Sequence, residues 1–314
     1  MYRVAVLLPT YNSEHFILQQ ITSITLQRNV SVELFVYDDF STDLTPEILN
    51  KISKLHPIKV YPSIKKFGSA SGSFFYLLKQ SVDYFAYFDF VAFADHDDIW
   101  MSDKLIEAIN LIEGTQSVCY SSSATPIKSS SKIGIKPMSG GTKSSAQKRF
   151  DYVFEGPGPG CTFVFKSNFA INLSKFLTLK GEKLTSVFWH DWFIYAYSKN
   201  KNYKWIIDPR SFILYMQHGS NETGVNAGLA AKVRRLKALC NGFYLFQARN
   251  NLALIDQSST IYSRLIRFNL FDRVWFAINI FSMRRRIIDS IALLFLLILN
   301  PFSLSSDKKF TKYF

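Results

Sequence analysis

Residues 87–100, YFDFVAFADHDDIW, join a near-continuous apolar run to a tight group of acidic side chains. The apolar run at 87–94 shows little alternation of polar and apolar residues, which is typical of a strand covered on both faces. Such strands form parallel sheets in α/β proteins, and ligands bind beyond the carboxyl ends of the strands. The stretch therefore predicts an α/β fold with a ligand site at Asp95, Asp97 and Asp98.

The chain before this stretch repeats the alternation of strand and helix. We predict strands at 3–9, 32–37 and 58–61, and helices at 13–27, 45–55 and 72–84. Strands joined by crossover helices form a parallel sheet, so the residues that directly follow each strand should meet at one edge. These residues are Pro9, Thr10, Tyr11 and Asn12 after the first strand, and Asp38 and Asp39 after the second.

The acidic group carries the most chemistry. In an extended segment residues i and i+2 point the same way, so Asp95 and Asp97 are predicted to face one ligand. Three carboxylates within four residues repel one another unless a cation compensates them, which favours a divalent metal with oxygen ligands, Mg or Mn. A second interpretation is that Asp98 caps a helix that begins near Ser102.

Composition excludes several classes of protein. The 314 residues are 48% hydrophobic and 19% charged, which is too apolar for a disordered chain. The three cysteines, Cys119, Cys161 and Cys240, form no Cys-x-x-Cys pair, so neither a disulfide framework nor a cysteine zinc cage is indicated. Only five consecutive apolar residues precede Pro9, so we expect no export signal and a reducing compartment.

The positive charge is concentrated in the last part of the chain. From Lys232 onward there are 14 Lys or Arg and four Asp, so this part supplies +10 of the net charge of +13. Its apolar segments, 274–281 and 291–299, flank Arg284, Arg285 and Arg286 and are too short to span a bilayer. We predict amphipathic helices in a membrane interface with these cations facing anionic headgroups. The alternative is a helical subdomain packed on the main core, and the aliphatic setting of the cations argues against nucleic acid.

Three motifs carry a family resemblance: LLPTYN at 7–12, YDDFSTD at 37–43 and FADHDDIW at 93–100 resemble those of the family 2 inverting glycosyltransferases. GCTFVF at 160–165, WHDW at 189–192 and YMQHG at 215–219 are similar to the branch that includes bacterial rhamnosyltransferases of surface polysaccharide synthesis. The resemblance implies the GT-A fold, a mostly parallel sheet with flanking helices, over residues 1–225. Its nucleotide-binding half would be 1–115 and its acceptor-binding half 116–225. The membrane-associating helical region that we predict from the charge and the apolar segments would then be 226–314.

The resemblance also assigns roles to the donor site. The Asp-x-Asp motif is Asp95-His96-Asp97, in which Asp97 would hold the metal and Asp95 would contact the ribose and the metal shell. Asp39 would bind the pyrimidine imide, while Thr10 and Tyr11, with Pro9 and Asn12 beside them, would line the base pocket. The alternatives are that Asp38 and Asp39 cap the helix near Thr45 and that Tyr11 serves ordinary packing.

Two further positions come from later motifs. The resemblance implies that His218 completes the metal shell, although a lone histidine is often structural. The Gly-Pro-Gly-Pro-Gly run at 156–160 has the flexibility of a tight backbone approach, so we expect this loop, with Gly160, beside the donor sugar, against the alternative of a surface turn. Residues 121–148, rich in Ser, Lys and Gly, are predicted to form a loop on the acceptor side.

An inverting transfer is a single displacement, so a base must take the proton of the acceptor hydroxyl. Asp191 is our candidate, because it lies in the aromatic segment VFWHDWFIYAY at 187–197, where low polarity makes a carboxylate more basic. His190 is the rival base. The structural alternative is that Asp191 only stabilises a helix N-terminus.

The predicted function is therefore transfer of a sugar from a dTDP- or UDP-linked donor to a bacterial surface polysaccharide or a polyprenyl-diphosphate-linked glycan. The branch resemblance favours rhamnose from dTDP-rhamnose, at the inner, cytoplasmic face of the cell membrane. The alternatives are a UDP-hexose or UDP-N-acetylhexosamine transferase and an inactive membrane-docked scaffold. A dinucleotide enzyme is disfavoured, because LLPTYNSEH after the first strand contains no Gly-x-Gly-x-x-Gly.

Overall fold

The computed structural model describes residues 1–130, 134–137, 146–217 and 242–299. Its strands are β1 (Tyr2–Thr10), β2 (Val30–Asp38), β3 (Ile58–Tyr61), β4 (Phe90–Phe93), β5 (Ile99–Trp100), β6 (Cys119–Ser130), β7 (Gly134–Pro137), β8 (Val164–Lys166) and β9 (Trp205–Gln217). Its α-helices are α1 (Ile17–Thr25), α2 (Thr45–Ile52), α3 (Ala70–Gln80), α4 (Lys104–Thr115), α5 (Ser167–Lys180), α6 (His190–Asn200), α8 (Phe243–Ile255), α9 (Thr260–Arg267), α10 (Leu270–Ile278) and α11 (Ile287–Leu299). The 3-10 turns are η1 (Phe85–Tyr87), η2 (Asp151–Val153), η3 (Gly160–Thr162), η4 (Gly181–Ser186) and η5 (Ile280–Ser282).

The strands form one sheet in the order β3-β2-β1-β4-β8-β6-β9-β5, with β7 paired to β6. The first four strands are parallel, as predicted. Beyond β4 the sheet is mixed, because β8 pairs antiparallel to both β4 and β6, and β5 pairs antiparallel to β9. The prediction of a mostly parallel sheet is therefore right for the first half of the fold and wrong for the second.

Both faces of the sheet are covered by helices, which explains the apolar runs in the sequence. In β1, Ala5 and Leu7 belong to the cluster formed with α3, α5 and α6, whereas Val4, Val6 and Leu8 belong to the cluster formed with α1, α2 and α4. Successive side chains of a strand point to opposite faces, so a strand with both faces buried is apolar at every position. The parallel pairing of β1 with β2 and with β4 places the carboxyl ends of these three strands at one edge of the sheet.

The prediction of a loop at 121–148 is wrong for β6 and β7. The serine-rich segment forms a central strand, and the Ser121 hydroxyl finds partners inside the protein, whereas Ser123 Oγ is buried with no hydrogen-bond partner among the described residues. Ser121 Oγ donates to the Pro157 carbonyl at 3.2 Å and accepts from Trp205 Nε1 at 2.9 Å. Buried hydroxyls with hydrogen-bond partners are compatible with a core strand, so composition alone misleads here.

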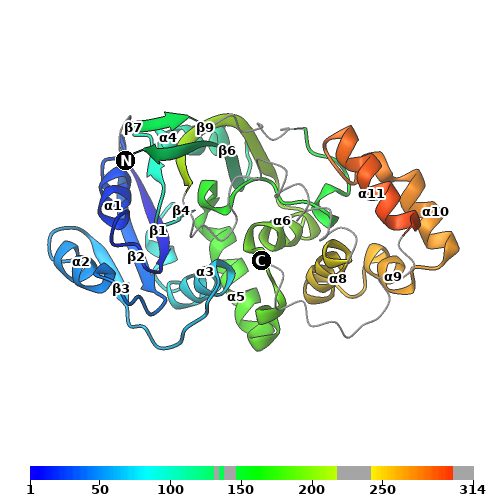
Figure 1. The fold of residues 1–314 in the computed structure, drawn as a ribbon, viewed down its shortest axis with the longest axis horizontal. Helices are drawn as coiled ribbons and strands as arrows, with labels where there is room; N and C mark the ends of the chain where they lie inside the picture. The colour runs from blue at the N-terminus through cyan, green and yellow to red at the C-terminus, as the bar shows by residue number, and fades with distance from the viewer. Residues whose placement is uncertain (131–133, 138–145, 218–241, 300–314) are drawn as a thin grey trace.

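The described C-terminal helices, α8 to α11, pack beside α6, at the end of the molecule away from β1, β2 and β3 (Figure 1). Val153, Phe154 and Trp192 share a buried cluster with apolar residues of these helices. No helix in the described part of the chain combines the length and apolar character needed to cross a membrane. The packing agrees with the alternative of a helical subdomain set on the core.

Two of the three predicted headgroup-facing arginines point inward. The Arg285 side chain is 2% exposed and pairs with Asp151 at 3.0 Å and with Glu155 at 3.4 Å. Arg284 pairs with Glu155 at 3.8 Å and with Asp289 at 3.5 Å, and only Arg286 is exposed. The prediction that the whole triplet faces lipid is therefore wrong, because carboxylates of the same chain already compensate Arg284 and Arg285.

Candidate active site

The loops that follow β1 and β2 are tied together at the predicted edge of the sheet. The Asn12 N–H donates to Ser41 Oγ at 2.8 Å, and the Thr42 N–H donates to Asn12 Oδ1 at 2.8 Å. Asn12 itself has a φ of 45°, a left-handed conformation that asparagine tolerates better than most residues. Asn12 thus connects the loop after β1 to the loop after β2 by two hydrogen bonds, and the sequence predicts that both loops bind the nucleotide.

Pro9 and Thr10 lie buried at the end of β1, whereas Tyr11 is 41% exposed. The Thr10 hydroxyl forms a hydrogen bond with the Ser13 hydroxyl, so it fixes the turn into α1. The ammonium of Lys66 lies 4.4 Å from the centroid of the Tyr11 ring and 3.2 Å from its hydroxyl. Ordinary core packing therefore does not account for Tyr11, which offers an open aromatic face beside a cation.

The paired aspartates after β2 have separate partners. Asp39 accepts hydrogen bonds from the backbone N–H groups of Phe67, at 2.6 Å, and Gly68, at 2.7 Å. Asp38 accepts from the Ser41 N–H at 3.0 Å, and burial raises the pKa of its carboxyl. The alternative that these aspartates cap α2 is wrong: the Thr45 N–H donates to Asp43 at 3.0 Å.

The acidic segment after β4 is not extended. His96 and Asp97 form a turn, which brings residues i and i+3 together instead of i and i+2. Ligand atoms of Asp95, Asp98 and Cys161 all lie within 4.8 Å of one another. The geometric reason for pairing Asp95 with Asp97 is therefore wrong, although Asp97 is buried in the same segment and its role in metal binding stays a prediction.

The acidic group fits a divalent cation with oxygen ligands. Asp98 is 1% exposed, and among the described residues neither of its carboxylate oxygens makes a hydrogen bond of good geometry, although the Cys161 thiol and the Met216 backbone lie nearby. Burial, Asp97 and Asp95 together raise the pKa of the Asp98 carboxyl. A bound cation would relieve this repulsion. Burial also raises the pKa of the Cys161 thiol, so its neutral form is a poor ligand for Mg or Mn.

Asp98 does not serve as a helix cap. The helix α4 begins at Lys104, after Asp103, with no side-chain capping hydrogen bond. Lys104 is 1% exposed, its ammonium lies 3.5 Å from the centroid of the Trp100 ring, and burial lowers its pKa to about 7. The lysine nearest in sequence to the acidic group is thus only partly charged at neutral pH.

Sequence reasoning missed Tyr215 as a neighbour of the acidic group. Ile99 pairs with Leu214 in the antiparallel ladder of β5 and β9, so the next position brings Tyr215 alongside Asp98. Burial first, and then the charge of Asp95, raise the pKa of the Tyr215 hydroxyl. Tyr215 is the first residue of the YMQHG motif at 215–219, of which only His218 is predicted from the sequence as a site residue. His218 lies outside the described residues.

The predicted base and its rival lie at the start of α6. Asp191 is half-buried, and its Oδ1 accepts from the Trp192 N–H at 2.7 Å. The His190 ring packs 4.5 Å from the Phe74 ring and 6.0 Å from the Phe93 ring, between centroids. Phe93 is the last residue of β4, so the N-terminus of α6 lies at the same sheet edge as the acidic segment.

His190 is a poor candidate for the base. Its Nε2 is buried and has no hydrogen-bond partner among the described residues, and burial lowers the pKa of the imidazole to about 4. An ordinary carboxylate has a similar pKa, so basicity does not separate the two candidates. The buried Nε2 of His190 is closed to an acceptor hydroxyl, whereas the Asp191 side chain is half-buried. The geometry therefore favours Asp191, whose catalytic role stays a prediction.

Gly160 makes room for His190. A Cβ built on Gly160 would lie 2.2 Å from His190 Nε2, so no side chain fits there. Its role in binding the donor sugar stays a prediction.

We expect Gly160→Ala to lower the free energy of unfolding by about 1–3 kcal/mol, because overpacking forces neighbouring side chains to shift. Gly114→Ala is the matched control: Gly114 lies in α4, and a Cβ added to it would meet nothing within 4 Å, so the change should stabilise by about 0.5–1 kcal/mol. Urea unfolding of both variants measures the difference. Equal stability of the two variants would contradict the close contact.

Comparisons with known proteins agree with this geometry. The model of Glycosyl transferase family 2 matches residues 5–170. The dTDP-rhamnosyl transferase RfbG of Shigella flexneri is 34% identical over 295 residues, which cover 93% of this chain and 99% of that protein. The UDP-Glc:alpha-D-GlcNAc-diphosphoundecaprenol beta-1,3-glucosyltransferase WfgD of Escherichia coli is 32% identical over 111 residues, covering 35% of this chain and 41% of that one.

The fold is also that of a solved glycosyltransferase. The mannosyltransferase PcManGT from Pyrobaculum calidifontis, in complex with GDP-Man and Mn²⁺, superposes with a TM-score of 0.53. It is 17% identical, and the match covers 96% of this chain and 72% of that one. The family match over more than half of the chain and the relative aligned along nearly its whole length confirm the resemblance seen in the motifs. The chain belongs to glycosyl transferase family 2.

Proposed function

We propose that this chain transfers rhamnose from dTDP-rhamnose to a polyprenyl-diphosphate-linked glycan of bacterial surface polysaccharide synthesis. The observation that carries the proposal is the meeting of the acidic segment at 95–98 with the N-terminus of α6 at one sheet edge. The donor is inferred from the Shigella relative, which is similar along nearly the whole chain. The acceptor class is inferred from the Escherichia relative, whose name describes a diphosphoundecaprenol-linked sugar.

In this proposal Asp97 and Asp95 hold Mg or Mn, and His218 completes the set. The metal, when bound, supplies a Lewis acid that neutralises the charge developing on the departing diphosphate. The complex of PcManGT with Mn²⁺ supports the choice of cation. Asp191 takes the proton of the acceptor hydroxyl on the face opposite the leaving group.

The base pocket follows from the two tied loops. Each carboxylate offers about four lone-pair positions, so Asp39 can accept from the pyrimidine imide while it holds the N–H groups of Phe67 and Gly68. The exposed ring of Tyr11 provides a surface for stacking, and Pro9, Thr10 and Asn12 keep it in place. Gly160 lies beside the sugar. UDP-hexose and UDP-N-acetylhexosamine donors are the alternatives, which the same pocket chemistry accommodates.

Calorimetric titration with dTDP and with UDP, each with and without Mn²⁺, tests whether the chain is a nucleotide-sugar enzyme. We expect dTDP to bind tightly only with the metal, because the diphosphate shares its charge with the cation. An inactive scaffold would bind neither nucleotide. Tighter binding of UDP than of dTDP would show that the donor is a UDP-sugar and not dTDP-rhamnose.

We also propose that the chain docks at the inner, cytoplasmic face of the cell membrane through α10 and α11, within the C-terminal region at 226–314. In this proposal both halves of the glycosyltransferase domain, 1–115 and 116–225, lie on the cytoplasmic side of the lipid surface. Large apolar side chains, 44% to 82% exposed, lie on these helices and the turn between them: Leu270, Phe271, Val274, Ile278, Phe281, Ile287, Ile288, Ile291 and Phe295. We call this set the apolar face.

The apolar face, rather than the arginine triplet, should dominate membrane binding. Burying one large apolar side chain contributes about 1.5–3 kcal/mol, whereas an exposed cation such as Arg286 contributes about 1 kcal/mol at an anionic surface. Phe271 and Ile278 are seven residues apart and share one side of α10. We expect a Phe271→Asp and Ile278→Asp double variant to bind liposomes of anionic lipid at least about 100-fold more weakly.

Liposome sedimentation measures this binding. Leu179→Asp is the matched control, because Leu179 is 84% exposed but belongs to α5. It should bind like the unmodified chain. Unchanged binding of the double variant at both low and high salt would show that the apolar face does not dock on lipid.

A further inference from the structure

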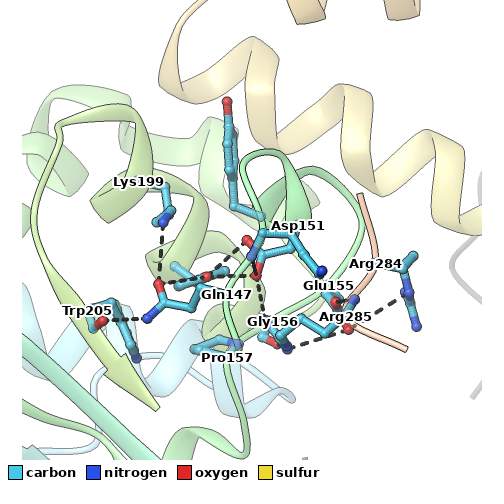
Figure 2. Close-up of polar contacts among 12 residues, drawn as sticks. Gln147, Asp151, Glu155, Gly156, Pro157, Lys199, Trp205, Arg284 and Arg285 are labelled. Carbon is cyan, nitrogen blue, oxygen red and sulfur yellow. Dashed lines mark hydrogen bonds and ion pairs between the residues drawn. The ribbon is translucent and has the colours of Figure 1, made fainter. Parts of the chain in front are cut away.

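Arg285 lies where the C-terminal helices meet the segment before β8 (Figure 2). Its Nη1 pairs with Asp151 Oδ2 at 3.0 Å, and its Nη2 donates to the Gly156 carbonyl at 2.5 Å. Nη2 also lies 3.4 Å from Glu155 Oε2. The Arg285 side chain is 2% exposed and that of Asp151 is 0% exposed, so the pair is sealed from water. One planar guanidinium thus holds three separate points of the 151–156 segment.

From Asp151 the contacts continue to α6. The Tyr195 hydroxyl donates to Asp151 Oδ1 at 3.0 Å and lies 3.1 Å from Oδ2. Burial raises the pKa of the Tyr195 hydroxyl, so it keeps the proton that it donates. Tyr195 comes four residues after Asp191, so the two side chains lie on one side of the helix, one turn apart.

From Gly156 a second set of contacts reaches the same turn of α6. A Cβ built on Gly156 would lie 3.3 Å from both the N and the Cα atoms of Trp192. At the other end of the loop, Gly160 contacts His190. The loop at 156–160 therefore lies against the residues on both sides of Asp191, and the Arg285 guanidinium holds the loop by the Gly156 carbonyl.

We propose that Arg285 is a positioning residue for sugar transfer, which fixes Asp191 by way of Asp151 and Tyr195 and by way of Gly156 and the first turn of α6. This inference rests on the proposed role of Asp191 as the base. A residue 94 positions later in the chain would thereby set the geometry of proton transfer. A reacting group must be held within a fraction of an ångström, and a misplacement of about 1 Å costs about 100-fold in rate.

Arg285→Lys tests the proposal. The lysine ammonium keeps the charge opposite Asp151, but a single nitrogen cannot reproduce the two-nitrogen contact with Asp151 and the Gly156 carbonyl. We expect kcat to fall about 10- to 100-fold while the Kd of dTDP, measured with Mn²⁺, changes less than about twofold. Tyr195→Phe removes only one hydroxyl from the same set of contacts, and we expect kcat to fall about twofold to tenfold with the same unchanged Kd.

Arg267→Lys is the matched control. Arg267 pairs with buried Asp272 through Nη2 at 2.6 Å and Nε at 2.8 Å, within α9 and α10. The Arg267 side chain is 57% exposed, but its substitution perturbs another ion pair with a fully buried carboxylate in the same C-terminal region, so it reports the effect of disturbing that region. We expect its kcat to stay near that of the unmodified chain.

The outcomes separate this proposal from the proposed function. Equal kcat values for Arg285→Lys and Arg267→Lys, or a loss of dTDP binding that matches the loss of kcat, would overturn the positioning role. If Arg285→Lys loses the circular dichroism spectrum of the folded chain, Tyr195→Phe decides, and an unchanged kcat overturns the proposal. An Asp191→Asn variant that keeps full turnover would instead overturn the role of Asp191 on which the inference rests.

Discussion

Replacement of Asp97 by asparagine is expected to abolish sugar transfer and to leave the protein folded. Asparagine has nearly the same shape but lacks the charge that holds a divalent cation, and the loss of a Lewis acid at a departing diphosphate removes several kcal/mol of transition-state stabilisation. We expect a fall in kcat of at least about 1,000-fold. Removal of the metal by a chelator should reduce the rate of the unmodified chain to the same level.

Asp103→Asn is the control for this variant, because Asp103 pairs on the surface with Arg28 at 3.6 Å and its side chain is 47% exposed. Asp98→Asn should be measured beside it, since ligand atoms of Asp98 and Asp95 lie within 4.8 Å of one another. A greater loss for Asp98→Asn would move the main metal contact to Asp98. Full turnover of Asp97→Asn in the presence of the chelator would exclude a metal-assisted mechanism.

Asp191→Asn is expected to lower kcat by about 100- to 10,000-fold, the usual contribution of a positioned general base. The asparagine oxygen can still accept from the Trp192 N–H, so the start of α6 should be preserved. The donor does not depend on the base for binding, and we therefore expect the Kd of dTDP to stay unchanged. Calorimetry and initial rates on one preparation measure both quantities.

A loss of donor binding as large as the loss of rate would contradict this assignment. Asp191 would then belong to the donor pocket, and His190 would return as the candidate base. The burial of His190 Nε2 makes that outcome unexpected.

The parallel half of the fold was predictable because its strands are buried on both faces. Four strands and three helices were expected in the right order, and β3 has the bounds that the sequence predicts. The second half was not predictable in the same way. The strand β8 has only three residues, and β6 is rich in serine, of which Ser121 forms hydrogen bonds with the distant residues Pro157 and Trp205.

The residues of the candidate site likewise fall into a predictable group and an unpredictable group. Residues that follow parallel strands, such as Asn12 and Asp39, lie at the expected edge because strand order alone places them there. The turn at His96 and Asp97 depends on local backbone geometry, which the apolar pattern does not reveal. The contact between Arg285 and Asp151 joins residues 134 positions apart, so no sequence period could have shown it.

Transfer of a sugar from a nucleotide donor to a lipid-linked acceptor can be measured directly. The most direct measurement incubates the chain and Mn²⁺ with a synthetic lipid-diphosphate-linked N-acetylglucosamine and, in separate reactions, dTDP-rhamnose, UDP-glucose, UDP-galactose and UDP-N-acetylglucosamine. Mass spectrometry of the acceptor should show the addition of one rhamnose from dTDP-rhamnose and no product from the other donors. A product from a UDP-sugar alone would contradict the proposed donor, and the absence of product from every donor would contradict the proposed reaction.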